Sequence, residues 1–124
     1  MRLLLDTHVV IWALSGARLS KAARAAIQHP NNRVYCSAAS LWEMAVKAGL
    51  GRLVMPADLL GTFDQQDIEV LPVTATHAVA VLALPDLHRD PFDRMLVAQA
   101  RVEGLAVVTR DADIKRYDVE VLDA

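Results

Sequence analysis

The sequence predicts an α/β fold, a three-layer α/β/α sandwich with a central, mostly parallel β-sheet. Short apolar runs alternate along the chain with stretches of helical periodicity, the pattern of repeated strand–helix–strand units. The apolar runs are nearly continuous, which is typical of parallel strands that helices cover on both faces. At 124 residues, 54% of them hydrophobic, the chain has room for one domain, residues 1–124, with one core.

Five apolar runs are predicted as the strands of this sheet. The first is a run of leucines that follows Arg2 and is closed by Asp6. The other runs are separated by turn-forming residues or by helical segments. The predicted strands are residues 2–5, 33–36, 68–73, 106–109 and 119–122.

Capping residues identify the helical segments between the strands. Ser20, Thr74 and Asp90 are expected as N-caps, and either Ser37 or Ser40 caps the third helix. Prolines at 56 and 91 suit the first turn of a helix. The predicted helices are residues 9–14, 20–27, 37 or 40 to about 48, 56 to about 66, 74–84 and 91–104, with a short turn or helix near 112–116. The β-branched residues of 9–14 leave a strand as the alternative there.

The composition indicates which cellular compartment and which kinds of partner are expected. Acidic residues number 15 against 13 Lys and Arg, so no overall positive field attracts nucleic acid. An RNA substrate would therefore need local basic residues and a metal ion for its phosphates. Cys36 is the single cysteine, which excludes an internal disulfide and fits a reducing cytoplasm. A lone cysteine in a strand-like run is expected to be a small core residue. The longest uncharged run contains Pro72 and Pro85, so no membrane span or targeting segment is expected.

Four acidic residues are predicted to meet beyond the carboxyl ends of the strands, where open α/β sheets bind their ligands. Asp6 ends the first strand, and Asp111 follows the fourth. Glu43 lies in the first turns of the helix after the second strand. Asp93 lies in the first turn of the helix that Asp90 opens, and this turn reaches the same edge if the helix runs antiparallel to the strands.

Each of these acids also has an ordinary structural explanation. Asp6 is placed to cap a helix, and Asp93 is a first-turn acid of the kind that the helix dipole favours. Glu43 stands four residues before Lys47 and can pair with it, while Asp111 suits a turn. These explanations weaken when the acids are taken together, because four carboxylates at one edge repel one another.

A divalent cation would remove that repulsion. Mg²⁺ and Mn²⁺ prefer carboxylate oxygens and water as ligands. Such an ion activates water for in-line attack on a phosphodiester and stabilises the charge on the phosphate and the leaving oxygen. The acids therefore predict metal-dependent cleavage of phosphodiester bonds.

Four motifs, in this order and spacing, resemble those of the PIN-domain ribonucleases, and among them the VapC-type toxins. The motifs are LLLDTH at 3–8, SLWEMAVK at 40–47 followed by GLG at 49–51, HRDPFDRMLVAQA at 88–100, and TRD at 109–111. The resemblance covers essentially the whole chain, and it implies a PIN-like α/β/α sandwich.

The resemblance also implies which carboxylates form the catalytic metal site, with Mg²⁺ or Mn²⁺ as the cofactor. These are Asp6, Glu43, Asp93 and Asp111. Asp93 is preferred to Asp90 because the third acid of the family stands three residues before an aliphatic residue and five before an alanine. Leu96 and Ala98 occupy those positions here.

Other residues near the acids are given supporting roles by the resemblance. Thr7 and Thr109 are placed to orient the acids by hydrogen bonding. His8 stands where many family members carry Ser or Asn, and it either assists near the metal or lies in the wall of the site. Three arginines are candidates for contacts to RNA phosphates, with a solvated surface position as the alternative: Arg89, Arg94 and Arg110.

VapC-like toxins pair with a small antitoxin, and they commonly form homodimers. The resemblance therefore implies an RNA substrate, a VapB-like antitoxin whose C-terminal segment blocks the acidic groove, and a homodimer. Contact with DNA is expected only through the antitoxin. The high apolar fraction is consistent with such interfaces.

Two other classes of protein remain as alternatives. An aspartate-nucleophile hydrolase on a similar sheet would carry a second Asp two residues after the first, where this chain has His8. A non-catalytic module is the other class, either a PIN-like binding scaffold or a receiver-type signalling domain. A degenerate PIN scaffold would lack some of the acids, and the position of Lys115 does not suit a receiver.

Burial is expected for the large aromatic residues and exposure for two histidines. Trp12, Trp42 and Phe63 are placed in the core because of their apolar area. His29 and His77 are placed on the surface.

Overall fold

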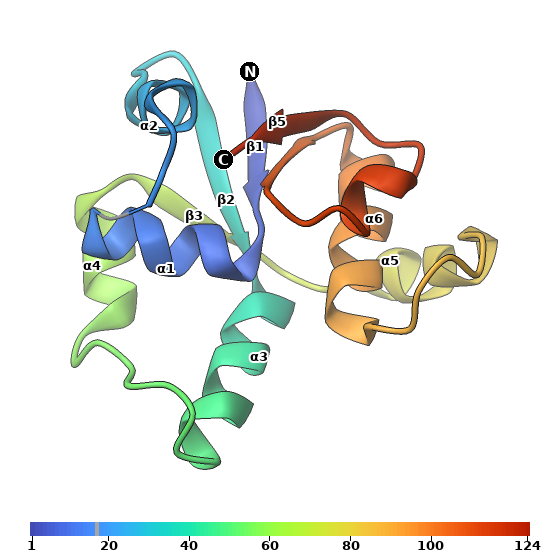
Figure 1. The fold of residues 1–124 in the computed structure, drawn as a ribbon, viewed down its shortest axis with the longest axis horizontal. Coiled ribbons are helices and arrows are strands. Elements are labelled where there is room, and N and C mark those ends of the chain that lie inside the picture. The colour runs from blue at the N-terminus through green and yellow to red at the C-terminus, as the bar shows by residue number, and fades with distance from the viewer. Residues whose placement is uncertain (17) are drawn as a thin grey trace.

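The computed structural model describes residues 1–16 and 18–124, and its centre is a five-stranded sheet (Figure 1). The strands are β1 (Arg2–Leu5), β2 (Arg33–Ser37), β3 (Ile68–Leu71), β4 (Ala106–Thr109) and β5 (Val121–Asp123), in the order β3-β2-β1-β4-β5. Every neighbouring pair is parallel. All five carboxyl ends therefore lie at the same edge, as the sequence predicted.

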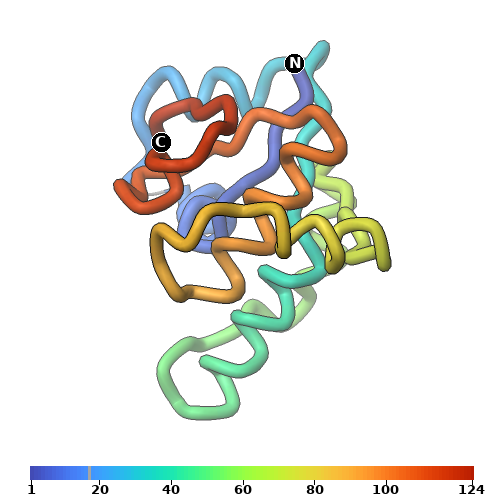
Figure 2. The backbone as a smooth tube through the Cα atoms, turned by 90° about the vertical axis from the view of Figure 1, so that its right-hand side faces the viewer, coloured from blue at the N-terminus to red at the C-terminus, as the bar shows by residue number. Residues whose placement is uncertain are grey.

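Helices cover both faces of the sheet and complete the predicted three-layer sandwich. They are α1 (Thr7–Ser15), α2 (Lys21–Gln28), α3 (Ala38–Gly49), α4 (Leu59–Gln65), α5 (Ala75–Ala80) and α6 (Pro91–Glu103), with short 3₁₀ helices at Val81–Ala83 and Ile114–Arg116. Figures 1 and 2 show α3 and the loop after it extending beyond the carboxyl edge of the sheet. No helix in residues 1–16 and 18–124 is long and apolar enough to cross a membrane.

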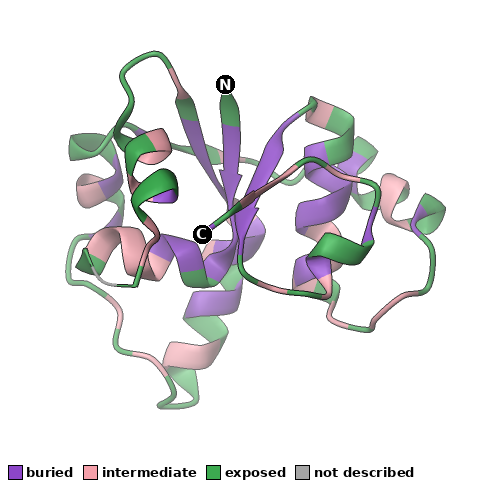
Figure 3. Cartoon of the chain, turned by 45° about the horizontal axis from the view of Figure 1, so that its top comes forward, coloured by how far each residue is buried: buried purple, intermediate pink, exposed green. Residues whose placement is uncertain are grey.

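The alternation of side chains along β1 divides the hydrophobic core in two. Leu3 and Leu5 point into a cluster that includes residues of α1, α2 and α4, while Leu4 points into a cluster built mainly from α6. Figure 3 shows the strands buried between these layers. Because both faces of β1 are covered, its leucines are consecutive and do not alternate with polar residues.

Most predicted helix starts are confirmed by side-chain caps. Ser20, Thr74 and Asp90 each accept hydrogen bonds from the first turns of α2, α5 and α6. Ser37, one of the two serines proposed for α3, accepts from the Ala39 amide. Residues 9–14 lie within helix α1, so the alternative of a strand there is wrong.

Several predicted boundaries are wrong, for identifiable reasons. The fourth helix starts at Leu59 instead of residue 56. The Asp58 side chain accepts from the Gly61 amide, one of the first-turn amides that have no partner within the helix. β3 stops at Leu71, before Pro72, which has no N–H for the ladder. The segment 74–84 ends as 3₁₀ helix, and Leu84 is extended because Pro85 follows it. The last strand is residues 121–123 instead of 119–122.

Two expectations about burial are also wrong. His77 is only 1% exposed, because it packs between α5 and α6 and bonds to Glu103. Trp42 is 65% exposed and packs edge-on against Phe92, with the ring centroids 5.3 Å apart. The other three expectations hold: His29 is exposed, Phe63 is buried and Trp12 is partly buried.

Candidate active site

Asp6 connects β1 to α1 at the carboxyl edge of the sheet. It occupies the N-cap position of α1, but in the described structure its side chain makes no capping hydrogen bond. Instead Thr109 Oγ1 donates to Asp6 Oδ2 over 2.8 Å, and the Asp6 amide donates to the Val108 carbonyl of β4. The carboxylate is 4% exposed. The helix-capping explanation for Asp6 is therefore wrong.

Glu43 is buried in the second turn of α3, beside the end of β1. Thr7 Oγ1 donates to Glu43 Oε1 over 2.7 Å and lies 3.0 Å from Ser40 Oγ. Lys47 Nζ lies 2.9 Å from Glu43 Oε2, so the expected pair one turn apart is present. The pairing does not make Glu43 a solvated surface residue, because it is only 7% exposed.

Asp93 lies in the first turn of α6 and is 8% exposed. Its pKa rises from the ordinary 3.8 to about 8, first because burial removes water from the charged form and then because of nearby negative charge. The charges that contribute belong to Asp90, Asp6, Asp111 and Glu43. The structure thus brings the four predicted acids within electrostatic range of one another.

Asp111 follows β4 and is linked to Asp6 through one hydroxyl group. Thr109 Oγ1 accepts from the Asp111 amide over 2.9 Å while it donates to Asp6. Asp111 Oδ1 also accepts from the Asp113 amide, so the turn explanation is correct as far as the local backbone is concerned. Burial raises the pKa of Asp6, the Thr109 bond and the charge on His8 oppose this shift, and Asp111 adds to it.

The three candidate arginines have different surroundings. Arg110 is exposed, its Nε donates to the Ala124 carbonyl over 2.6 Å, and its guanidinium lies 4.6 Å from the centre of the Trp12 ring. Arg89 is exposed. Arg94 donates from Nη1 to the Pro85 carbonyl and to Tyr117 Oη, so its guanidinium is used inside the fold. His8 is exposed and stands with its ring 6.1 Å from that of Trp12.

The donor set is suited to a hydrated Mg²⁺ or Mn²⁺ ion. All four candidate ligands are carboxylates, which such ions prefer. Within residues 1–16 and 18–124, no three His, Cys, Asp or Glu side chains converge tightly enough to hold one ion directly. Mg²⁺ usually keeps several waters and takes only one or two carboxylates, so a looser arrangement fits it. A cation beside Asp93 would offset the negative charge that, after burial, contributes to its raised pKa.

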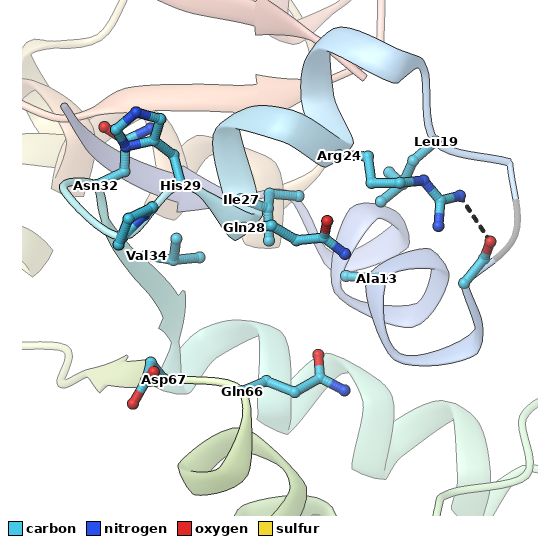
Figure 4. A pocket seen from close by; sticks show the side chains of 12 residues that line it. Ala13, Leu19, Arg24, Ile27, Gln28, His29, Asn32, Val34, Gln66 and Asp67 are labelled. Carbon is cyan, nitrogen blue, oxygen red and sulfur yellow. Dashed lines mark hydrogen bonds between the residues drawn. The ribbon is translucent and has the colours of Figure 1, made fainter.

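A cavity of the described structure lies away from the four acids. It has a volume of about 370 Å³ and opens between α1, α2 and the amino end of β2 (Figure 4). Its lining includes Arg24, Gln28 and Asn32, and Arg24 donates to the Gly16 carbonyl over 2.7 Å. The described residues that line it include none of the four acids. The acids instead lie at the opposite ends of the strands, where α/β sheets bind ligands.

Two residues near the acids were given no role by the sequence. His88 Nε2 lies 3.4 Å from Asp93 Oδ2, and His88 Nδ1 lies 2.7 Å from Tyr117 Oη. His88 was recognisable as a neighbour of the site, because it opens the motif at 88–100. Tyr117 gave no such signal, since it lies 29 residues from His88 in the chain.

Comparisons with known proteins show the family to which the chain belongs. The model of the PIN domain family matches residues 3–120. The chain is 31% identical over 118 residues to Ribonuclease VapC22 of Mycobacterium tuberculosis, covering 92% of this chain and 90% of that protein. Both matches thus cover nearly the whole length of the chain. The chain belongs to the PIN domain family, and the predicted resemblance to its VapC-type members is confirmed.

Solved structures show the same fold at lower identity. VapBC2 from Rickettsia felis, bound to a promoter DNA fragment, superposes with a TM-score of 0.75 at 17% identity, covering 99% of this chain and 98% of that one. DNA-bound VapBC from Salmonella typhimurium gives a TM-score of 0.70 at 21% identity over the same shares. These similarities confirm the predicted PIN-like α/β/α fold.

Proposed function

We propose that this protein is a metal-dependent endoribonuclease and the toxin component of a type II VapBC-like toxin–antitoxin system. The observation that carries the proposal is the group of four carboxylates at one sheet edge, three of them buried and one with its pKa raised to about 8. The names of the relatives, Ribonuclease VapC22 and the VapBC complexes, support both the reaction and the toxin role. Residues 1–124 then form a single PIN domain.

The proposed metal ligands are the four acids, and threonine hydroxyl groups hold two of them. When bound, Mg²⁺ or Mn²⁺ would activate the attacking water and stabilise charge on the phosphate. Thr109 fixes the orientation of Asp6, and Thr7 fixes that of Glu43. Asp93 holds a proton near neutral pH in the protein alone, because its pKa is about 8, and it gives up that proton when positive charge is added beside it.

Phosphate binding is proposed for the arginines at the rim of the site. Arg110 is the best placed, because it adjoins Asp111 in the sequence and is exposed, and because its stacking on Trp12 and its bond to the Ala124 carbonyl hold the guanidinium in one orientation. An oriented guanidinium binds phosphate oxygens with two parallel hydrogen bonds. Arg89 is available from the exposed loop before α6. Arg94 is the weakest candidate, since it is bonded inside the fold.

The proposed partners are a VapB-like antitoxin and a second copy of the chain. Exposed apolar side chains offer surface for such contacts: Trp42 and Val46 on α3, and Leu50 just after its end. A basic side chain of the antitoxin would be favoured in the acidic groove. DNA would be reached only through the antitoxin. A cytoplasmic location stays a prediction from the single cysteine, Cys36, which is free and buried.

RNA cleavage by the purified protein tests the proposal. We expect a structured RNA to be cut with Mg²⁺ or Mn²⁺, and EDTA to stop the reaction. Cleavage undiminished by EDTA would contradict the metal mechanism. No cleavage with either ion, in a protein that still binds its antitoxin, would favour the alternative of a non-catalytic PIN-like module. Family membership argues against the aspartate-nucleophile hydrolase and the receiver domain.

A further inference from the structure

A chain of hydrogen bonds reaches Asp93 from residues outside the group of four acids. Arg94 Nη1 donates to Tyr117 Oη over 3.0 Å, and Tyr117 Oη lies 2.7 Å from His88 Nδ1. His88 Nε2 in turn lies 3.4 Å from Asp93 Oδ2. We call the three residues Arg94, Tyr117 and His88 the Asp93 relay.

Arg94 favours one direction for the hydrogen bonds in the relay. A guanidinium can only donate, so Tyr117 Oη accepts from it and has its own proton free for the next partner. A partner for that proton lies 2.7 Å away at His88 Nδ1, which accepts it in the tautomer that carries the ring proton on Nε2. The imidazole proton is left on Nε2, facing Asp93 Oδ2. Each member of the relay is therefore a donor to the next.

Packing holds the relay in place. Tyr117 is 4% exposed, and the side chains of His88 and Asp93 are 11% and 12% exposed. The rings of His88 and Tyr117 meet edge to face with their centroids 5.4 Å apart. Arg94 also donates to the Pro85 carbonyl over 2.9 Å. The relay thus joins the loop before α6, the first turn of α6 and the segment between β4 and β5.

We propose that His88 is a positioning residue for the metal site, held by Tyr117 and Arg94 so that it donates to Asp93 Oδ2 and leaves Oδ1 for a divalent cation. The inference rests on the proposed function. It assigns Arg94 to the support of the acid instead of to phosphate. Partners of this kind, behind a metal ligand, typically change metal affinity or activity by about 10- to 100-fold when removed.

Four variants separate positioning from packing. His88→Phe keeps a ring against Tyr117 but deletes both nitrogens, and His88→Gln keeps an amide donor in place of Nε2–H. Tyr117→Phe deletes only the hydroxyl group. The matched control is His77→Phe, because His77 is bonded to Glu103 at the other end of α6. The measurements are the Mn²⁺ dissociation constant, by titration calorimetry on the full chain, and the melting temperature.

We expect His88→Phe to weaken Mn²⁺ binding by about 10-fold or more, with His88→Gln less affected and Tyr117→Phe weakened in the same direction. His77→Phe should lower the melting temperature and leave the Mn²⁺ affinity unchanged. An unchanged affinity in His88→Phe, or an equal loss in His77→Phe, would overturn the inference. If His88→Phe does not fold, the single-atom change Tyr117→Phe decides in its place. A wild type that binds no Mn²⁺ would overturn the proposed function and this inference together.

A second measurement examines the relay without any metal. Nitrogen chemical shifts of ¹⁵N-histidine-labelled protein distinguish the two neutral tautomers of each ring. We expect His88 to carry its proton on Nε2 in the metal-free protein, and Tyr117→Phe to release this preference. A ring with its proton on Nδ1 would overturn the relay even if RNA cleavage is found, so the two failures can be told apart.

Discussion

The two ends of α6 carry the same kind of residue pair but differ in their surroundings. At the carboxyl edge of the sheet, His88 faces Asp93, whose pKa is raised first by burial and then by four further carboxylates. At the amino edge, His77 is bonded to Glu103 over 2.8 Å, and its Nδ1 accepts from the Thr74 amide as part of a capping box. The second pair has a local structural role at the start of α5.

A buried histidine–carboxylate pair therefore does not by itself identify a functional site. His77 is even less exposed than His88, so burial does not separate the two pairs. What separates them is the excess of like charge around Asp93, which a structural site would have no reason to collect. The predictions below test whether this excess of charge defines the function.

The largest effect is expected when a carboxylate of the acid group becomes an amide. Asp6→Asn and Asp93→Asn should each reduce RNA cleavage by at least about 100-fold, because a metal contributes several kcal/mol to transition-state stabilisation and each 1.4 kcal/mol is about tenfold. The matched control is Glu103→Gln at the other end of α6, which should retain cleavage. Initial cleavage rates at saturating Mg²⁺, with circular dichroism to confirm folding, measure the difference. Equal losses in all three variants would remove the distinction between the two ends.

A smaller effect is expected from the hydroxyl group that orients two acids. Thr109→Val keeps the shape of the side chain but removes the donor to Asp6 Oδ2 and the acceptor for the Asp111 amide. Cleavage and Mn²⁺ affinity should fall by about tenfold, the lower range for partners behind a metal ligand. Thr74→Val removes the cap of α5, and it should lower only the melting temperature. If Thr109→Val cut RNA like the wild type, Thr109 would be no more than part of the core.

Much of this architecture could be predicted from the sequence because the signals are local. The continuous apolar runs gave the five strands, and the caps at Ser20, Thr74 and Asp90 were correct. The start of α4 was not, since Pro56 and Asp58 both suit a first turn and only the fold selects the residue whose carboxylate meets a free amide.

Features that depend on contacts between distant segments could not be predicted. The exposure of Trp42 depends on where α3 extends beyond the sheet, and the burial of His77 depends on α5 packing against α6. The same holds inside the site. The four acids follow from their places at strand and helix ends, whereas the contact between His88 and Tyr117 forms only when the segment after β4 folds back beside α6.

The stability of the metal-free protein should fall with rising pH because of Asp93, at the start of α6. Because the folded-state pKa of Asp93 is raised to about 8, the folded protein binds an extra proton above the ordinary value of 3.8. The stability of the metal-free protein is therefore lost as pH rises from about 4 to about 8. Asp93→Asn should remove this loss and raise the melting temperature in EDTA at about pH 8. The expected rise is about 4 °C for each kcal/mol gained in the free energy of unfolding.

Glu103→Gln is the control for that measurement, and it should lower the melting temperature because His77 loses a charged partner. The Asp93→Asn variant should also gain less from added Mg²⁺ than the wild type, since stabilisation by a ligand follows its affinity. Thermal unfolding in EDTA and in Mg²⁺ across this pH range measures both effects. An Asp93→Asn protein less stable than the wild type in EDTA, with an equal gain from Mg²⁺, would mean that the acids do not strain the fold.

The smallest effect is expected from the acid next to the site. Asp90 Oδ1 accepts from the Phe92 and Asp93 amides, and an asparagine oxygen can accept the same bonds. Asp90→Asn should therefore keep α6 capped and change the cleavage rate by no more than about twofold, since Asn and Asp are equivalent as N-caps.

The Asp90→Asn variant also loses one of the charges that raise the pKa of Asp93, so this pKa should move down toward its ordinary value. The pH at which the metal-free protein loses stability should move down with it, and thermal unfolding across pH measures this shift. Were Asp90→Asn as damaging to cleavage as Asp93→Asn, the assignment of the third acid to Asp93 would be wrong, and the boundary between the functional end of α6 and its structural cap would have to be redrawn.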